Sequence, residues 1–307
     1  MYKYLLTPIF AFFLCSVKAQ SPIELLFSNS SYLSTDEASP LWFSANQYGR
    51  ILSGQKFLNL SVLSVKKSYS EGKESGLNFK WGGDFVAGLS SNSYYQLNQA
   101  YTGASLKGWE IAAGMFHDPI RYSGLSTTNG NVVRSVNARP YPMIRIATKD
   151  YKPLPLLNSF AFFKCEYDEG MLNDKRYVKN THLHHKSFFL KISATRSMDL
   201  HLGIDHYVMW GGVSGNDKIG KMPKSFKAYL RYITGASGDE SFPLTDQLNV
   251  AGNHLGAYTL EISKKFKSIE SAFYINHLFE DLSGVNLRNW PDNLIGIFIK
   301  LKDQKFL

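Results

Sequence analysis

Long stretches of this chain alternate between apolar and polar residues with a period of two. The clearest example spans residues 77–89, where Phe79, Trp81 and Phe85 share one face and Lys80 and Asp84 share the other. Successive side chains of a β-strand point to opposite faces, so this period predicts strands rather than helices. Ten segments have this pattern: 58–65, 77–89, 95–104, 109–115, 159–167, 188–193, 200–210, 257–266, 269–279 and 294–301.

Several of these segments run for about ten residues or more, whereas strands of soluble proteins are typically about five or six residues long. A tilted strand needs about 9–11 residues to cross a bilayer. One face of the segments is aliphatic and aromatic, and the other carries Lys, Asp, Glu, Asn, His and Gly. We therefore predict an all-β fold of about ten or eleven strands, a transmembrane antiparallel up-and-down β-barrel with lipid outside and a wet lumen inside.

The connections between the predicted strands differ in length. Those at 90–94, 107–108 and 267–268 are short, and those at about 116–158, 168–187 and 211–256 are long. Short turns at one end and long loops at the other are typical of outer-membrane barrels.

The last of the long connections contains a predicted helix. Phe226, Tyr229, Leu230 and Ile233 have the spacing of one helical face, after Pro223 and before Gly235. A helix this short is marginal alone in water, so we expect its apolar stripe to dock, at the barrel mouth.

The N-terminus has the features of a secretory signal peptide over residues 1–19. Lys3 is followed by an apolar core from Leu5 to Leu14, and Val17-Lys18-Ala19 resembles a cleavage site. The mature domain is then 20–307, which contains no apolar run long enough for a transmembrane helix. It keeps a single cysteine, Cys165, which we interpret as a packing residue.

The formal net charge is +9, and removing Lys3 and Lys18 with the signal leaves +7. This balance favours acidic partners such as anionic polysaccharide or lipopolysaccharide. No run of Lys and Arg resembles a nucleic-acid-binding arm, and the secretory signal argues against that partner. The cations concentrate in residues 119–149, which contain no Asp or Glu. There, Pro140 and Pro142 make a stiff extended segment around Tyr141.

No motif indicates an enzyme. The chain lacks a Gly-x-Ser-x-Gly elbow, a phosphate loop and a zinc motif. Adjacent acidic pairs such as Asp168-Glu169 point apart on an extended chain, and we interpret them as solvated loop charges. His182 and His184 would share a face on a strand with metal-ligand spacing, but with no evident acidic partner we interpret the cluster 182–185 as uncoordinated loop histidines.

Several stretches, in order, resemble the Wzi-type capsule-assembly family of outer-membrane barrels. The resemblance extends over nearly all of the mature chain. The stretches are 42–49 (WFSANQYG), 135–142 (SVNARPYP), 150–155 (DYKPLP), 185–190 (HKSFFL), 223–229 (PKSFKAY), 249–256 (NVAGNHLG) and 277–281 (HLFED).

The resemblance implies an outer-membrane barrel of about eighteen strands, an even number as in bacterial single-chain barrels. It implies a lectin-like role without catalysis, cofactor or metal: holding capsular or exopolysaccharide at the surface of a Gram-negative cell. The implied partners are that polysaccharide, outer-membrane lipid and lipopolysaccharide, and the barrel assembly machinery. With ten or eleven strands counted here, we expect a barrel incomplete at its C-terminal end, which closes poorly alone.

From their chemistry and loop positions we predict a set of polysaccharide-binding residues. Arginine suits carboxylate groups, tyrosine stacks on sugar rings, and asparagine and histidine hydrogen-bond hydroxyls. The set is Arg121, Arg134, Asn137, Arg139, Tyr141, Arg145, Asn249, Asn253 and His254.

Three alternatives remain open at this point. Arg139 and Arg145 could instead fasten their segment to lumenal carboxylates such as Asp84. The protein could be a diffusion porin with an anion-selective basic loop. An outer-membrane hydrolase has the least support, since no nucleophile or carboxylate pair is evident.

Overall fold

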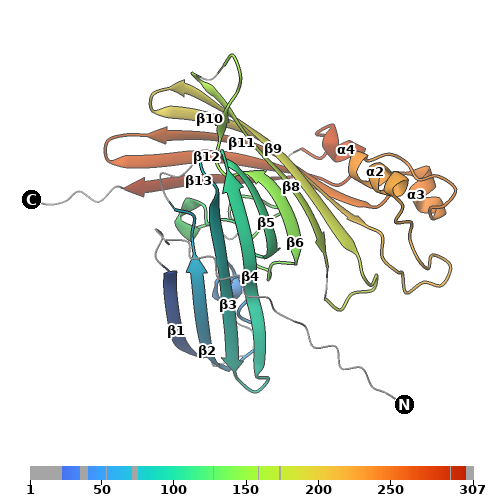
Figure 1. Ribbon diagram of the computed structural model, residues 1–307, viewed down its shortest axis with the longest axis horizontal. Coiled ribbons are helices and arrows are strands. Elements are labelled where there is room, and N and C mark those ends of the chain that lie inside the picture. Colours follow the sequence, from blue (N-terminus) through green and yellow to red (C-terminus); the bar gives the residue numbers. More distant parts are fainter. Residues whose placement is uncertain are drawn as a thin grey trace, which may run out of the picture.

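A single antiparallel sheet makes up most of the computed structural model, which describes residues 23–34, 41–52, 54–70, 75–126, 128–157, 159–172, 174–290 and 292–301 (Figure 1). The predicted signal peptide lies outside these residues. The strands are β1 (Ile23–Leu33), β2 (Phe57–Lys67), β3 (Asn78–Leu89), β4 (Tyr94–Leu106), β5 (Trp109–Met115), β6 (Met143–Thr148), β7 (Lys152–Pro153), β8 (Ala161–Met171), β9 (His182–Thr195), β10 (Met198–Trp210), β11 (Asn253–Lys265), β12 (Ile269–Phe279) and β13 (Asn293–Leu301).

Strands that are neighbours in the chain are neighbours in the sheet, except that the short β7 pairs with β8 and stands off the main path. Every pairing is antiparallel, so the predicted up-and-down topology is confirmed. β1 and β13 do not pair with each other, so the sheet is curved but open. Among the described residues, four α-helices accompany it: α1 (Leu41–Ser44), α2 (Phe226–Thr234), α3 (Leu244–Leu248) and α4 (Leu282–Val285). No helix in the described ranges is both long and apolar enough to span a bilayer.

The thirteen described strands exceed the ten or eleven predicted, for physical reasons. β1 does not alternate, because this edge strand is exposed along nearly its whole length. β6 has six residues directly after Pro142 and lies inside the connection predicted at 116–158. The connection predicted at 168–187 is also too long, since β8 continues to Met171 and β9 begins at His182.

The two ends of the sheet carry different connections, as predicted, except that the short connection 90–93 lies at the same end as the long ones. Residues 107–108, 196–197 and 266–268 make tight turns at one end. The segments 34–56, 116–142 and 211–252 all lie at the other end. This end of the sheet, which also carries the four helices, is called the loop end below.

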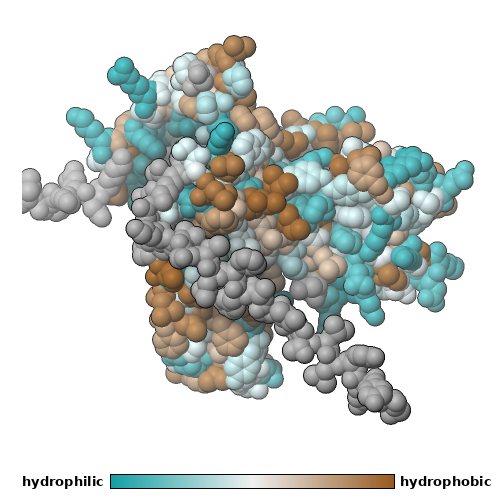
Figure 2. Space-filling view, viewed as in Figure 1, coloured by the Kyte–Doolittle hydropathy of each residue, from teal (hydrophilic) through white to brown (hydrophobic). Residues whose placement is uncertain are grey.

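The curved sheet is called the wall below. Its convex face is largely apolar and its concave face is largely polar. On β3, Phe79 and Phe85 are exposed on the outer side, whereas Asn78 and Asp84 are buried on the inner side. Figure 2 shows hydrophobic side chains gathered over β1–β4 and hydrophilic ones over the end with α2–α4. β2 departs from this rule: its apolar residues at 58, 60 and 62 face inward and pack with Ile51, because segment 41–56 folds against them.

The outer surface of β1 and β2 carries a small polar group. The Asn29 and Asn59 amides donate to each other at 3.0 Å, and they also donate to Ser61 and Ser31 at 2.7 and 2.9 Å. These bonds tie the edge strand to its neighbour and fix its register.

We expect Asn59→Ala to weaken β1 pairing by about 1 kcal/mol, the typical contribution of such hydrogen bonds. Faster amide hydrogen exchange of residues 24–32 would report it. A double-mutant cycle with Asn29→Ala is the control: fully additive effects would show that the amide pair does not couple the strands.

Helix α2 forms where predicted. The Ser225 hydroxyl accepts a hydrogen bond from the Ala228 amide, and Gly235 ends the helix in the left-handed conformation, at φ 67°. The predicted docking is wrong in place and partly wrong in face, because Tyr229 of the predicted stripe contacts Trp210 whereas Phe226 and Leu230 are exposed. α2 packs on the outer side of the wall, against Val208 on β10, with Ala228 and Tyr232 as the buried residues. The spacing of apolar residues predicted the helix but did not show which of them pack against the sheet.

Candidate functional site

The arginines of the basic segment meet carboxylates inside the curve of the sheet. Arg145, on β6, is only 6% exposed. Its Nε and Nη2 donate to the Asp168 carboxylate at 2.8 and 3.2 Å, and its Nη1 donates to Asp118 at 3.0 Å. Asp168, from β8, is fully buried. A buried ion pair with this many hydrogen bonds fixes β6, β8 and the start of loop 116–142 relative to one another.

Arg134 joins the same network from loop 116–142. Its Nη2 donates to Asp118 at 2.9 Å, and its Nη1 lies 3.3 Å from Glu166 and 3.1 Å from His185 Nδ1. Burial opposes its charge, but the surrounding carboxylates, Asp118 foremost, raise the pKa of Arg134 well above its usual value. The guanidinium therefore holds the loop inside the sheet as a permanent cation.

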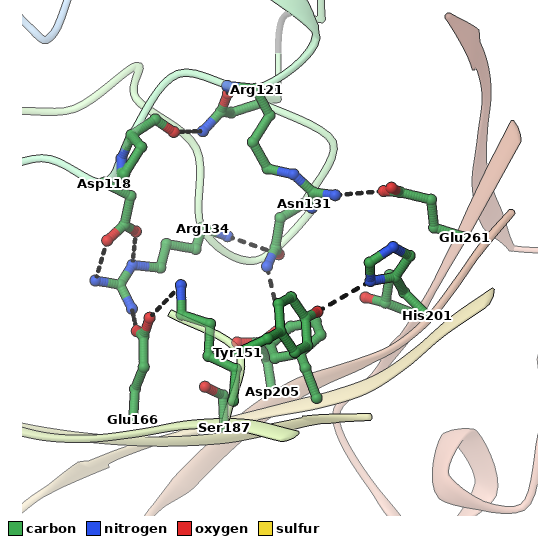
Figure 3. A pocket seen from close by; sticks show the side chains of 15 residues that line it. Asp118, Arg121, Asn131, Arg134, Tyr151, Glu166, Ser187, His201, Asp205 and Glu261 are labelled. Atoms are coloured by element: carbon green, nitrogen blue, oxygen red, sulfur yellow. Dashed lines mark hydrogen bonds and ion pairs between the residues drawn. The ribbon is translucent and has the colours of Figure 1, made fainter. Parts of the chain in front are cut away.

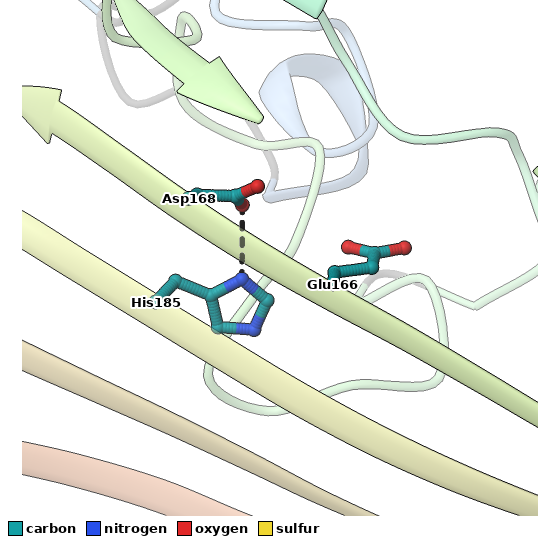
Figure 4. Close-up of side chains that lie close together, drawn as sticks. All are labelled: Glu166, Asp168 and His185. Atoms are coloured by element: carbon teal, nitrogen blue, oxygen red, sulfur yellow. Dashed lines mark hydrogen bonds and ion pairs between the residues drawn. The ribbon is translucent and has the colours of Figure 1, made fainter. Parts of the chain in front are cut away.

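Glu166, Asp168 and His185 come from two adjacent strands (Figure 4). A carboxylate oxygen of each acid and a ring nitrogen of the histidine all lie within 4.8 Å of one another. His185 bonds Asp168 through Nδ1 at 2.9 Å and Asp205 through Nε2 at 3.0 Å. Both ring nitrogens are thus occupied, and two arginines already neutralise the carboxylates. The group fits an ion-pair network better than a metal site, since a metal would have to displace these cations.

The loop interpretation of histidines 182–185 is wrong, because all of them lie on β9. Acidic partners, undetected in the sequence, come from β8: His184 bonds Glu169 at 2.7 Å on the outer face, opposite His185. Asp168 and Glu169 do point apart as expected, yet Asp168 is buried in the network rather than solvated in a loop.

Two segments far apart in the chain meet above this network. The Tyr48 amide donates to the Val136 carbonyl at 3.0 Å, and the Asn46 amide donates to the Asn137 side chain at 2.7 Å. Gly49, at φ 65°, has no room for a side chain, since a Cβ would lie 2.4 Å from the Arg139 nitrogen. Segment 41–56 therefore clamps the stiff segment 137–142 in place.

A cavity of about 300 Å³ lies between loop 116–142 and the inner faces of β8–β11 (Figure 3). Its wall includes Tyr151, Phe189 and His201, whose Nδ1 lies 3.1 Å from the Tyr151 hydroxyl. Burial raises the pKa of Tyr151 to about 12, so this hydroxyl remains protonated. Ser187 also lines the cavity, and its hydroxyl is buried without a hydrogen-bond partner. Charged groups complete the lining: Asp118, Arg121, Arg134, Lys164, Glu166, Asp205 and Glu261.

Comparison with known proteins identifies the family. The family model for capsule assembly protein Wzi matches residues 23–304. The chain belongs to the Wzi family. A solved structure of Wzi from Escherichia coli, described as an outer-membrane protein involved in group 1 capsule assembly and as a carbohydrate-binding β-barrel, has a similar fold. It is 15% identical, with a TM-score of 0.53, over 86% of this chain and 50% of that one. The chain thus spans half the length of that Wzi chain. The comparison with curated proteins gave no match.

The predicted binding residues of this Wzi-family chain fall into separate places. Arg121 and Arg134 line the cavity, where Arg121 pairs with Glu261 and Arg134 with the network. Arg145 lies behind the cavity in the network, a position that agrees with the alternative that it fastens its segment, whereas Arg139, named in the same alternative, is exposed. The partners of Arg145 are Asp168 and Asp118, whereas Asp84 pairs with Arg50 at 2.7 Å.

The remaining predicted residues lie away from the cavity. Tyr141 packs against Gly170, and its burial raises its pKa above the usual value. Asn137 and Arg139 are exposed on the clamped segment. Asn249 and Asn253 are exposed near α3, and His254 bonds His206 at 3.0 Å on the outer face of the wall. Polysaccharide binding by these residues stays a prediction.

Sequence reasoning overlooked the residues that make the cavity wall. Tyr151, Ser187, Phe189, His201 and Asp205 were not singled out, although the last four occupy inward positions on β9 and β10. Their alternation was the available signal, because Ser187 and Phe189 share a face and so do His201 and Asp205.

Proposed function

We propose that this chain is part of an outer-membrane barrel that binds capsular or exopolysaccharide and anchors it at the cell surface. The observation that carries the proposal is the cavity beside the buried network. It combines an aromatic wall of Tyr151, Phe189 and His201 with fixed donors and acceptors, including the unpartnered Ser187 hydroxyl. Aromatic faces and precisely placed polar groups are what a sugar ring requires of a pocket. Membership of the Wzi family supports the same role.

The charges of the cavity bear on the kind of sugar. Its lining carries three cations (Arg121, Arg134 and Lys164) against four carboxylates (Asp118, Glu166, Asp205 and Glu261). The basic segment is therefore neutralised where it enters the sheet, and the cavity favours an uncharged sugar unit. Acidic units of a polymer would meet exposed cations such as Arg139 instead. A salt titration separates these contributions, because only binding to acidic units weakens steeply with ionic strength.

A binding role is also favoured over catalysis. Glu261 pairs with Arg121, Glu166 with Arg134, and Asp205 accepts from Asn131 at 3.1 Å. Each of these three carboxylates is already engaged by a donor from loop 116–142, so none stands as a free acid/base partner across the cavity.

The porin alternative is disfavoured by the inserted loop. The Val132 amide donates to Asn276 at 2.7 Å, and Tyr122 stacks on Tyr274 with ring centroids 4.6 Å apart. These contacts hold loop 116–142 across the concave face, where a porin needs open water. Single-channel recording distinguishes the two functions: steady conductance would favour the porin.

Tyr151→Ala tests the binding site. Removing one stacking ring and its hydrogen bond should weaken polysaccharide binding about 5- to 10-fold. Calorimetry with purified capsular polysaccharide and detergent-solubilised protein measures the change. The control is Tyr95→Ala, because Tyr95 is exposed on the outer face beside Phe85. Equal affinity of the two variants would place the binding site elsewhere.

A further inference from the structure

The outer face of β8–β11 changes from apolar to ionisable at one level. The pairing register places side chains of adjacent strands in rows across this face. Two successive rows are apolar: Phe163–Leu190–Leu202–Leu260 and, next toward the loop end, Cys165–Phe188–Ile204–Tyr258. The next two carry ionisable groups: Tyr167–Lys186–His206 and Glu169–His184–Val208–His254. Such a change on four adjacent strands marks the edge of the lipid-facing band at the loop end.

Helix α2 lies directly on the ionisable rows. The Lys186 ammonium donates to the Ile233 carbonyl near the end of the helix, and the Tyr229 hydroxyl donates to Glu169 one row higher. Lys224, just before the helix, lies 3.1 Å from His182 in the row above that. The C-terminal end of α2 is therefore the end nearest to the lipid-facing band.

The side of α2 and α3 that faces away from the wall is apolar and exposed. On α2, Phe226 is 75% exposed and Leu230 is 42% exposed; on α3, Leu244 and Leu248 are 68% and 74% exposed. Cations accompany them, because residues 218–231 contain four lysines and one arginine without any Asp or Glu. Lys227 and Arg231 both pair with Asp239, and the other lysines of this stretch supply the excess positive charge. An amphipathic helix of this kind, continuous with a lipid-facing wall, matches the boundary between acyl chains and anionic head groups.

We propose that α2 and α3 form an interfacial anchor that binds lipopolysaccharide of the outer leaflet. Leu230 and its apolar neighbours contact the acyl chains, and the cations of 218–231 meet the lipid A phosphates. Charge complementarity and continuity with the lipid-facing wall select this occupant over a second protein. The anchor also fixes loop 211–252, which carries both helices, at the membrane boundary.

Depth-dependent quenching tests the position of the helix. Leu230→Cys and Asp217→Cys, each in a Cys165→Ser background and labelled with bimane, are reconstituted in vesicles of brominated phosphatidylcholine and lipid A. Cys165 is the free cysteine of the described ranges, and Asp217 is exposed in the loop beyond the end of β10. Quenching at position 230 but not at 217 is expected. Equal emission from both would overturn the proposal by placing α2 in water or under a protein partner.

The phosphate contact has its own test. The variant Lys218→Gln/Lys221→Gln/Lys224→Gln should bind lipid A more weakly, on the order of fivefold for each lysine removed. Titration of the detergent-solubilised protein with lipid A, read from bimane at position 230, measures this loss. Binding of dephosphorylated lipid A should be unaffected by the substitutions. An unchanged affinity for lipid A itself would contradict the role of these cations.

Discussion

Arg145→Ala should abolish stable assembly of the sheet, whereas Arg139→Ala should leave it intact. Arg145 is buried and makes three hydrogen bonds to the carboxylates of Asp168 and Asp118. Removing one partner of a buried pair leaves an uncompensated charge and typically costs about 3–5 kcal/mol. Arg139 is exposed, six residues away on the same basic segment. The two variants thus compare the same residue type with and without the network.

Heat-modifiable gel migration and urea unfolding in detergent measure assembly. The Arg145→Ala protein should lose the compact band and unfold at lower urea, while Arg139→Ala should match the parent protein. Arg145→Lys refines the test, because a lysine keeps the charge but cannot make the paired hydrogen bonds to Asp168. Partial rescue by lysine supports the network. If Arg145→Ala assembled normally and lost only glycan binding, Arg145 would be a binding residue instead.

The sequence was sufficient for the wall but not for what the wall holds. Alternation over 77–89 predicted which side chains of β3 face inward and which face outward, because successive residues of a strand point to opposite faces of the sheet. β6 escaped detection because its six residues follow two prolines and lie between long connections. A strand this short has too few alternating positions to stand out from a loop.

The site depends on contacts between distant residues. Arg145 meets Asp168 and Arg134 meets Glu166 only because the register places β6, β8 and loop 116–142 together. The absence of acidic residues from 119–149 made the segment look like a surface for anions. Its counter-charges come from the strands, and no pattern within the segment could reveal them.

The same separation explains the helix. The sequence predicted α2 from the spacing of Phe226 and Leu230, and those two residues are exposed. The wall covers Ala228 and Tyr232 instead. The side chains of the wall beneath the helix are partly ionisable, and one of them, Glu169, accepts a hydrogen bond from the Tyr229 hydroxyl. Helical periodicity finds an apolar stripe but not its partner, which here we propose to be lipid.

Acidification from pH 6.5 to 4 should destabilise the inserted segments through His117. Its ring lies 4.6 Å from the Tyr48 ring, in the residues that join segments 41–56 and 116–142. Burial, with a contribution from the nearby Arg50 charge, lowers the pKa of His117 to about 4. In the unfolded chain histidine titrates near 6.5, so between these values the unfolded state binds a proton that the folded state excludes. The free energy of unfolding therefore decreases as the pH is lowered through this window, by up to about 3 kcal/mol.

The variant His117→Gln isolates this effect from the carboxylates that also titrate near pH 4. Urea unfolding of both proteins at pH 7, 5.5 and 4 should give a steeper loss for the parent protein, with the difference growing as the pH falls. Arg50→Gln supplies a second control, because removing the neighbouring cation should raise the pKa of His117 and make the loss smaller. Parallel pH profiles for the parent protein and His117→Gln would contradict the assignment.

Because the Tyr48 amide also bonds Val136, protonation of His117 should release the clamp on segment 137–142 before the sheet itself unfolds. Faster amide exchange at residues 46–50 and 134–138 at pH 5, with unchanged exchange in β9 and β10, is the expected order of events.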